Sequence, residues 1–212
     1  GYVAVYSVST AAQLKAAGAL VTQKKCRRIV LTADIDLNGS SENLWEPINA
    51  EYNALKTGET NLEEFDGGNH TICNLYVDNV TNKTNTKGYY YGGLFYVLNG
   101  TVKDLTIDGA TVTCFRGAAL IGRLDAGLVE NCHVKNAKIY SEQKAGGLAG
   151  YVNNSSQDLI IRGCSASDIT LDKLSSMDEA YMMGGFIGYL QSYERNTLIE
   201  NNSVSNIAIN YI

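Results

Sequence analysis

The sequence has little proline, no long apolar run, no basic run and no zinc-site spacing of its cysteines. Each of these features limits the fold or the function that can be expected. Its 212 residues include one proline, and no apolar run approaches the length of about 20 residues that a membrane-spanning helix requires. We therefore expect no membrane-spanning segment, and the scarcity of proline argues against disordered linkers. With a net charge of −5 and no basic run, the chain is not expected to bind nucleic acid. The five cysteines lack the spacing of a zinc site, and no metal or cofactor is expected.

What the chain has instead is a repeat of about twelve residues, which is typical of solenoid folds. It occurs five times, beginning at Thr71, Thr101, Leu128, Ile160 and Leu198. Apolar and polar residues alternate within each copy, which indicates strands because successive side chains point to opposite faces. The alternation breaks twice per copy, always at Asn, Asp or Gly, which enter the left-handed backbone region at low cost. The expected bends are Asn74, Asp104, Asn131, Gly163 and Asn201, then Asn79, Gly109, Asn136, Asp168 and Asn206.

Aligning the copies places apolar residues in shared columns. The first of these columns contains Ile72, Val102, Val129, Ile161 and Ile199. Stacked coils would bury such columns inside a right-handed parallel β-helix, an all-β fold of about five to six coils. Cys132 and Cys164 share one interior column on adjacent coils. The pattern favours stacked buried thiols there and leaves a disulfide open.

A second repeated element precedes four of the copies and is rich in glycine. It comprises residues 92–98, 117–124, 145–152 and 183–190, where glycine permits a bend or a close backbone approach. Gly147-Leu148-Ala149-Gly150 and Gly185-Phe186-Ile187-Gly188 resemble the GLUG motif of β-helical surface and secreted bacterial proteins, which include adhesin-like and peptidase-associated regions. The start of the chain is also similar to that of exported Bacteroidetes β-helix proteins. The resemblance implies an exported module at the outer cell surface or in the extracellular space.

The two ends of the repeat region differ. Residues 1–64 are expected to form an N-terminal cap, with a helix at about residues 9–22 that starts from Ser9 or Thr10. This short capping helix is predicted to lie over the first coil and cover an open sheet edge. Residues 65–212 are expected to form the β-helix, and the last copy continues on pattern to its end. The C-terminal coil is therefore expected to be covered by another domain or subunit of a longer protein.

Two patterns of charged residues resemble sites. Asp34-Ile35-Asp36 matches the first half of an EF-hand calcium loop, but Trp45 occupies the position of the bidentate acid. Ile35 and Leu37 alternate as a buried strand face would, so a structural role is favoured. The outward column Lys103, Glu130, Arg162 and Glu200 alternates in charge, which predicts a ladder of ion pairs across the coils.

A polysaccharide-degrading lyase or hydrolase on this fold would need clustered carboxylates. Glu63, Glu64 and Asp66 come closest to such a cluster. They lead into a strand rather than into a groove, so no catalytic residue is predicted. The enzyme stays an alternative, and a structural spacer within a larger surface protein is a second alternative.

Tyrosine is abundant, with fourteen residues against four phenylalanines. The position after the last glycine of the glycine-rich element forms a column of Val97, Arg123, Tyr151 and Tyr189. Exposed aromatic rings beside polar groups are suited to holding sugars or protein partners. The favoured function is therefore adhesin-like binding of a glycan or a host or cell-surface protein. The predicted ligand-binding residues are Tyr89, Tyr90, Tyr91, Arg123, Tyr151 and Tyr189.

Overall fold

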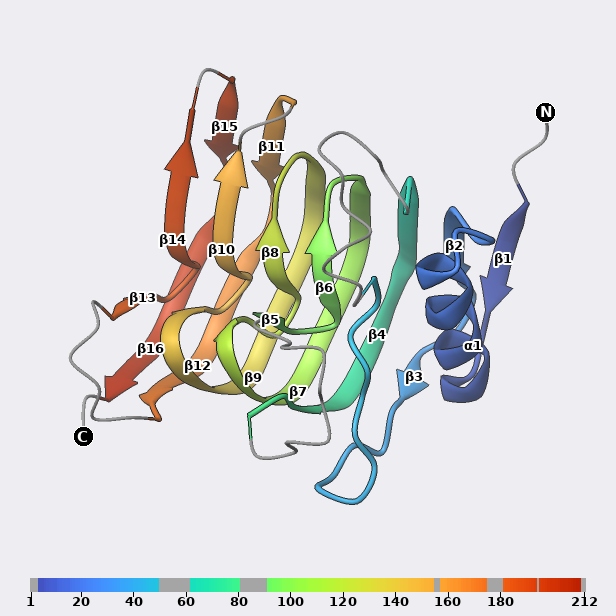
Figure 1. Ribbon diagram of the computed structural model, residues 1–212, viewed down its shortest axis with the longest axis horizontal. Helices are drawn as coiled ribbons and strands as arrows, with labels where there is room; N and C mark the ends of the chain where they lie inside the picture. The colour runs from blue at the N-terminus through green and yellow to red at the C-terminus, as the bar shows by residue number, and fades with distance from the viewer. Residues whose placement is uncertain are drawn as a thin grey trace.

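The computed structural model describes residues 4–49, 62–80, 91–154, 157–174, 181–193 and 195–210. Strands of successive coils lie side by side along the long axis, with the two ends of the chain at opposite ends of the molecule (Figure 1). Every ladder between named strands is parallel. The predicted all-β class and parallel β-helix architecture are confirmed.

In the described part of the chain, the strands form a larger and a smaller sheet. The larger sheet contains β1 (Val5–Val8), β2 (Arg28–Leu31), β3 (Ile35–Asp36), β4 (Glu64–Asp78), β5 (Tyr91–Gly92), β7 (Thr101–Gly117), β9 (Gly127–Gly146), β11 (Leu159–Arg162), β12 (Ser165–Lys173), β13 (Met182–Gly184), β15 (Thr197–Glu200) and β16 (Ser203–Asn210). The smaller sheet contains β6 (Phe95–Leu98), β8 (Ile121–Leu124), β10 (Ala149–Asn154) and β14 (Ile187–Ser192). Buried apolar side chains fill the space between these layers.

The predicted columns of the last four copies are confirmed. Val102 pairs with Val129, which pairs in turn with Ile161, and Ile161 pairs with Ile199. The first three of these side chains are fully buried. In each of the four copies both predicted bends adopt a positive φ, at Asp104, Asn131, Gly163, Asn201, Gly109, Asn136, Asp168 and Asn206. The left-handed residues therefore set the corners of every coil from β7 onward.

Side-chain amides link several corners to the coil before. Asn131 Nδ2 donates to Asp104 Oδ1 at 3.1 Å, and Asn206 Nδ2 donates to Asp168 Oδ1 at 3.0 Å. Asn136 Nδ2 donates to Asp108 Oδ1 at 2.8 Å. A corner asparagine thus supplies a tolerated backbone conformation and a bond that fixes the register of neighbouring coils.

The predicted alignment of the first copy is wrong. Ile72 pairs with Ile107, and the partner of Val102 is Phe65. The corners of this coil are Asn69 and Asn74, both with positive φ, whereas Asn79 has none. The two strand segments that flank each corner carry the same apolar pattern, so the sequence alignment slipped by one segment.

The predicted N-terminal helix is present as α1 (Ala11–Thr22). Thr10 caps it, since its Oγ1 accepts a hydrogen bond from the Gln13 N–H at 3.2 Å. The buried face of α1 consists of Leu14, Ala17, Gly18 and Val21. This face packs into the same apolar core as β2, and α1 lies in front of β1 and β2 (Figure 1).

The predicted short capping helix is confirmed, and its covering of a sheet edge stays a prediction. The outermost strand at this end is β1, whose one described ladder is with β2, and Val5 is 55% exposed. An apolar helix face is satisfied by apolar side chains, which lie on the inner surface of the sheet. The helix therefore packs its apolar face into the core at the first coil.

The glycine-rich element brings two backbone segments into close contact at each coil. A Cβ atom built on Gly150 would lie 2.6 Å from backbone atoms of Gly117, at the end of β7. A Cβ on Gly188 would lie 2.6 Å from the carbonyl oxygen of Ala145, near the end of β9. Only glycine permits this approach without displacing backbone. The residue after each glycine is thereby placed beside the end of the preceding strand.

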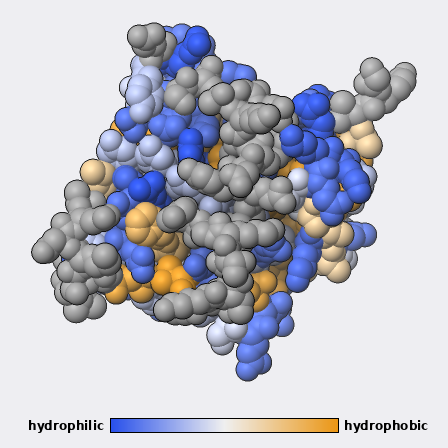
Figure 2. Space-filling view, viewed as in Figure 1, coloured by the Kyte–Doolittle hydropathy of each residue, from blue (hydrophilic) through white to orange (hydrophobic). Residues whose placement is uncertain are grey.

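The apolar columns reach the last coil with their side chains exposed. Ile199 is 39% exposed and Val204 is 47% exposed, whereas their partners Ile161 and Ala166 are fully buried. In the space-filling view the described surface is largely hydrophilic, with hydrophobic patches toward the C-terminal coils (Figure 2). That another domain or subunit covers this coil stays a prediction.

Candidate ligand-binding site

The chain gathers aromatic and basic side chains beside the glycine turns. We call them the tyrosine–cation cluster, and they are Tyr91, Tyr96, Arg116, Arg123, Lys144, Tyr151 and Tyr189. Two strand registers build it: Tyr91 pairs with Arg116 and Arg116 with Lys144 before the turns, while Tyr151 pairs with both Arg123 and Tyr189 after them. The close backbone approach at the glycines places these two columns against each other.

The tyrosine rings contact one another across coils. The Tyr91 and Tyr151 rings are stacked with centroids 6.3 Å apart and planes at 8°, and the Tyr151 and Tyr189 rings are stacked at 5.6 Å and 18°. Tyr96 meets Tyr91 edge to face at 5.3 Å. Tyr91 and Tyr96 are buried, whereas Tyr151 and Tyr189 are half-buried. The ring faces are therefore largely turned toward other rings of the cluster.

The basic side chains lie over these rings. The Arg116 guanidinium carbon is 5.5 Å from the centroid of Tyr151, and Lys144 Nζ is 5.2 Å from Tyr151 and 4.8 Å from Tyr189. The Arg123 guanidinium carbon is 5.8 Å from both Tyr91 and Tyr151. Such cation–π contacts contribute about 0.5–2 kcal/mol each, so the rings hold the cations in place.

Arg123 and Asp125 form an ion pair within the cluster, with Arg123 Nε 2.6 Å from Asp125 Oδ1. Burial disfavours the charge of Arg123, but the Asp125 carboxylate and Tyr91 outweigh it and raise the pKa of the guanidinium. Burial also raises the pKa of Asp125, and the Arg123 charge opposes that shift. Burial raises the pKa of the Tyr151 hydroxyl, again opposed by the Arg123 charge. The tyrosine hydroxyl therefore stays protonated at neutral pH and acts as a hydrogen-bond donor.

Polar tips surround the Tyr151 ring. Its hydroxyl lies 3.2 Å from Asn153 Oδ1 and 3.1 Å from Gln191 Oε1, on the same coil and the next. Gln143 Oε1 accepts hydrogen bonds from both Arg116 Nε and Lys144 Nζ. The cluster is thus a set of oriented donors and acceptors held by stacked rings.

The structure brings some of the predicted site residues together and does not describe others. Tyr91, Arg123, Tyr151 and Tyr189 come together in the cluster, whereas Tyr89 and Tyr90 lie outside the described residues. Val97 belongs to the predicted column but is buried.

Three members of the cluster were missed from the sequence: Tyr96, Arg116 and Lys144. A signal for two of them existed. Tyr91, Arg116 and Lys144 each stand one or two residues before a glycine of the repeated element, so they share a column.

The predicted ion-pair ladder is present in part. Arg162 Nε lies 2.6 Å from Glu130 Oε1, on adjacent coils. Lys103 pairs with Asp66 at 3.2 Å and Glu64 at 3.5 Å on the coil before.

The remaining acid of the Glu63–Asp66 group is also paired. Glu63 forms ion pairs with Arg27 at 2.9 Å and with Arg28 at 3.2 Å. The acids considered for a polysaccharide-degrading site are therefore part of a surface ion-pair network, and their geometry favours no catalytic role.

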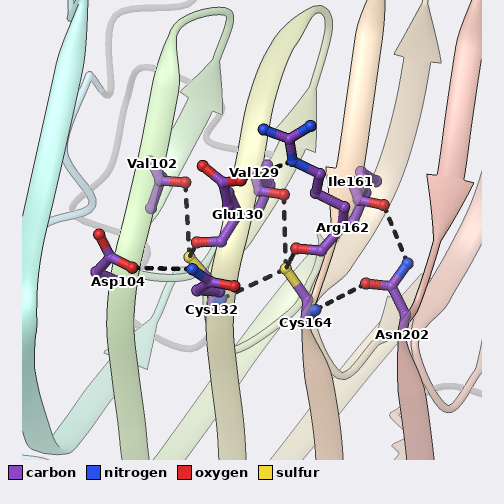
Figure 3. A network of polar contacts seen from close by, with 10 residues as sticks. Val102, Asp104, Val129, Glu130, Cys132, Ile161, Arg162, Cys164 and Asn202 are labelled. Atoms are coloured by element: carbon purple, nitrogen blue, oxygen red, sulfur yellow. Dashed lines mark hydrogen bonds and ion pairs between the residues drawn. The ribbon is translucent and has the colours of Figure 1, made fainter.

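The stacked thiols are confirmed. Cys132 and Cys164 are free and buried on adjacent coils, and the Cys132 N–H lies 3.4 Å from Cys164 Sγ (Figure 3). The neighbouring Cys164 thiol and burial both raise the pKa of Cys132. Asn202 continues the column: its Oδ1 accepts from the Cys164 N–H at 2.8 Å (Figure 3). These side chains serve the core.

The aspartates of the calcium-like pattern are bound by the protein itself. Asp34 Oδ1 accepts from the Thr71 N–H at 2.9 Å, and Asp36 Oδ1 accepts from Asn74 Nδ2 at 2.9 Å. Ile35 is buried, as the structural interpretation predicts. Within the described ranges, no group of three or more His, Cys, Asp or Glu side chains is arranged to hold a metal ion.

A histidine–serine pair lies on the outer surface of the sheet. His133 Nδ1 is 2.8 Å from Ser165 Oγ on the next coil. Among the residues that the structure describes, no carboxylate is bonded to the His133 ring, and both side chains lie on flat strands. The pair links two neighbouring strands, and within the described ranges it has no orienting acid of the kind found in a hydrolase triad.

Comparison with known proteins gives distant similarities. No protein-family model matches the chain. Halomucin of Haloquadratum walsbyi (strain DSM 16790 / HBSQ001) is 30% identical over 128 residues, which make up 57% of this chain and 1% of that protein. The chain thus spans about one hundredth of the length of that relative.

One solved structure is similar along most of the chain. It is a protein of Bacteroides ovatus described as a candidate immunoglobulin A1 protease, with 15% identity and a TM-score of 0.39. The match covers 96% of this chain and 74% of that one, but the likeness is too distant to support a function. Across the described residues, helix α1 is too short to cross a membrane, and no other helix there could do so.

Proposed function

We propose that this chain is a binding module of an extracellular or cell-surface protein and that it recognises a carbohydrate through the tyrosine–cation cluster. The observation that carries the proposal is the stacked series Tyr91–Tyr151–Tyr189, which runs across successive coils with basic side chains over its rings. The similarity to a short part of Halomucin and the GLUG-like motifs support a place in a larger surface protein.

The chemistry of the cluster suits sugars. A sugar presents many hydroxyl groups, which need donors and acceptors at fixed positions. Asn153, Gln191 and the Tyr151 hydroxyl supply both kinds of group within one neighbourhood. Because stacking already restricts the rings, little side-chain freedom is lost on binding, and that loss is a main cost of association.

The purified chain can be tested on a glycan array together with the double variant Tyr151→Ala/Tyr189→Ala. A matched control is Tyr6→Ala/Tyr140→Ala, which removes two half-buried tyrosines from β1 and from a part of β9 outside the cluster. We expect the first variant to lose binding and the control to keep it, with both retaining the circular dichroism spectrum of the wild type. Equal binding by all three proteins would contradict the proposed site.

A structural spacer within a larger surface protein is the second candidate. The exposed apolar columns of the last coil favour it, since such surface is stabilised when another element covers it. A wild-type chain that binds nothing on the array would favour the spacer over the binding module.

A further inference from the structure

The surface that the cluster offers to a ligand is mainly basic rather than aromatic. Tyr91 is 3% exposed, and the faces of Tyr91, Tyr151 and Tyr189 are turned toward each other or toward cations. Arg116 and Lys144 are half-buried and keep part of their side chains at the surface. A ligand therefore meets basic groups and hydroxyl tips, and the rings act as their support.

Arg123 and Arg116 differ in their ion pairing. Arg123 is neutralised by Asp125 at 2.6 Å. Arg116 contacts the Gln143 amide oxygen and the rings of Phe115 and Tyr151, and no carboxylate in the described part of the chain lies within ion-pair distance of it. The positive charge of Arg116 is thus left in excess on a chain whose net charge is −5.

Arg116 and Lys144 are two like charges directly opposite each other on neighbouring strands. They are register partners on β7 and β9, and both donate to the same atom, Gln143 Oε1. Like charges directly opposite on neighbouring strands are destabilising. The comparable outward pair Glu130–Arg162 has opposite charges. An anion placed between Arg116 and Lys144 would be attracted by both side chains.

We infer that the glycan bound by the tyrosine–cation cluster is acidic, and that its carboxylate or sulfate group binds between Arg116 and Lys144. This inference rests on the proposed function and names the class of sugar. Arginine is suited to such groups because its N–H donors match the oxygens of a carboxylate or sulfate, and the bonds are charge-assisted. The Tyr151 hydroxyl and the amides beside it then remain for the neutral hydroxyls of the same sugar.

The test measures binding to matched pairs of immobilised glycans. Each pair contains an acidic oligosaccharide and its neutral counterpart: sialylated and desialylated, uronate and carboxyl-reduced, sulfated and desulfated. The wild type is compared with Arg116→Gln/Lys144→Gln and with the control Lys25→Gln/Lys138→Gln, which removes the same charge at exposed positions outside the cluster. Thermal unfolding of each protein confirms that it is folded.

We expect the wild type to prefer the acidic member of at least one pair by about tenfold or more, as one charge-assisted hydrogen bond provides. The preference should weaken with added salt, because half-exposed charges are screened. The cluster variant should bind both members equally, and the control should behave as the wild type. The pair that shows the effect distinguishes carboxylate from sulfate.

Two results would overturn the inference in different ways. Equal binding of acidic and neutral members by the wild type would refute the acidic ligand and leave the carbohydrate-binding function standing. Binding of no glycan would refute both. Should the cluster variant fail to fold, the salt dependence and the acidic preference of the wild type still decide the question.

Discussion

Replacement of Gly150 by alanine tests the role of the glycine turns in building both the coil and the cluster. The added Cβ would lie 2.6 Å from three backbone atoms of Gly117, and real Cβ atoms do not approach so closely. No flexible side chain can yield there, so one of the two strands must move. Overpacking of this kind costs about 1–3 kcal/mol.

An opposing term reduces that cost. Alanine restricts the unfolded chain more than glycine does, which stabilises a protein by about 0.4–1 kcal/mol when the native backbone accepts it. The net expectation for Gly150→Ala is a loss of about 1–2 kcal/mol. For a chain of this size, 1 kcal/mol shifts the unfolding midpoint by about 2–4 °C, so the midpoint should fall by about 2–8 °C.

Thermal unfolding followed by circular dichroism measures the effect. The control Ser205→Thr adds one methyl group at an exposed strand position of β16, where threonine is well tolerated, and should change the stability by less than about 0.5 kcal/mol. Because Tyr151 follows Gly150, the variant should also bind glycans more weakly. An unchanged or higher midpoint for Gly150→Ala would refute the close backbone approach.

Three further predictions concern corners and charges. Asn136 has φ 56° and donates to Asp108, so Asn136→Ala should destabilise by about 1–2 kcal/mol more than Asn136→Gly in urea unfolding, and equal losses would contradict a strained corner. The Asn136 amide, then Lys135, lower the pKa of Asp108, so the unfolded state binds more protons near pH 4. Asp108 therefore stabilises the folded state at neutral pH, and this stabilisation is lost as the pH falls below about 4. When the free energy of unfolding is measured against pH, Asp108→Asn should make its decrease at acidic pH less steep. An unaltered curve would contradict this. Arg123→Ala leaves Asp125 largely buried without its partner and should cost about 2–3 kcal/mol in thermal unfolding, much of it recovered when Asp125→Ala is added; additive losses would argue against the pair.

The sequence predicted the coils correctly where the repeat could be aligned in one way. From Val102 onward, each copy contains two left-handed residues at fixed positions among its apolar residues, and these fix the register without reference to anything outside the copy. The first coil offered two equivalent interpretations, since Asn69 and Asn74 both suit a corner and the segments beside them look alike. Only the pairing of Phe65 with Val102, a contact between residues far apart in sequence, decides between them.

The sequence predicted the part of the candidate site that follows the glycine turns, but not the part that precedes them. Tyr151 and Tyr189 share a position relative to the last glycine of their elements, so their column is visible in the sequence. Arg116 and Lys144 lie on the strand before the turn, and their approach to Tyr151 depends on how sharply the chain bends. The bend follows from backbone contacts at Gly117 and Gly150, which the sequence shows as glycines but not as neighbours.

The same contact explains why we propose the binding surface at this corner of the coil. Along the flat strands the outward side chains come from one column at a time, as in the pair Glu130–Arg162, and neighbouring charges neutralise each other. At the glycine turn two columns converge, so a ring after the turn can lie beneath a cation before it. Side chains that are already held by stacked rings lose little conformational freedom when a ligand binds. No carboxylate among the described residues pairs with the positive charge of Arg116. The glycines that let two backbones meet therefore also concentrate oriented positive charge on an acidic chain, which is the requirement for selecting an acidic sugar over a neutral one.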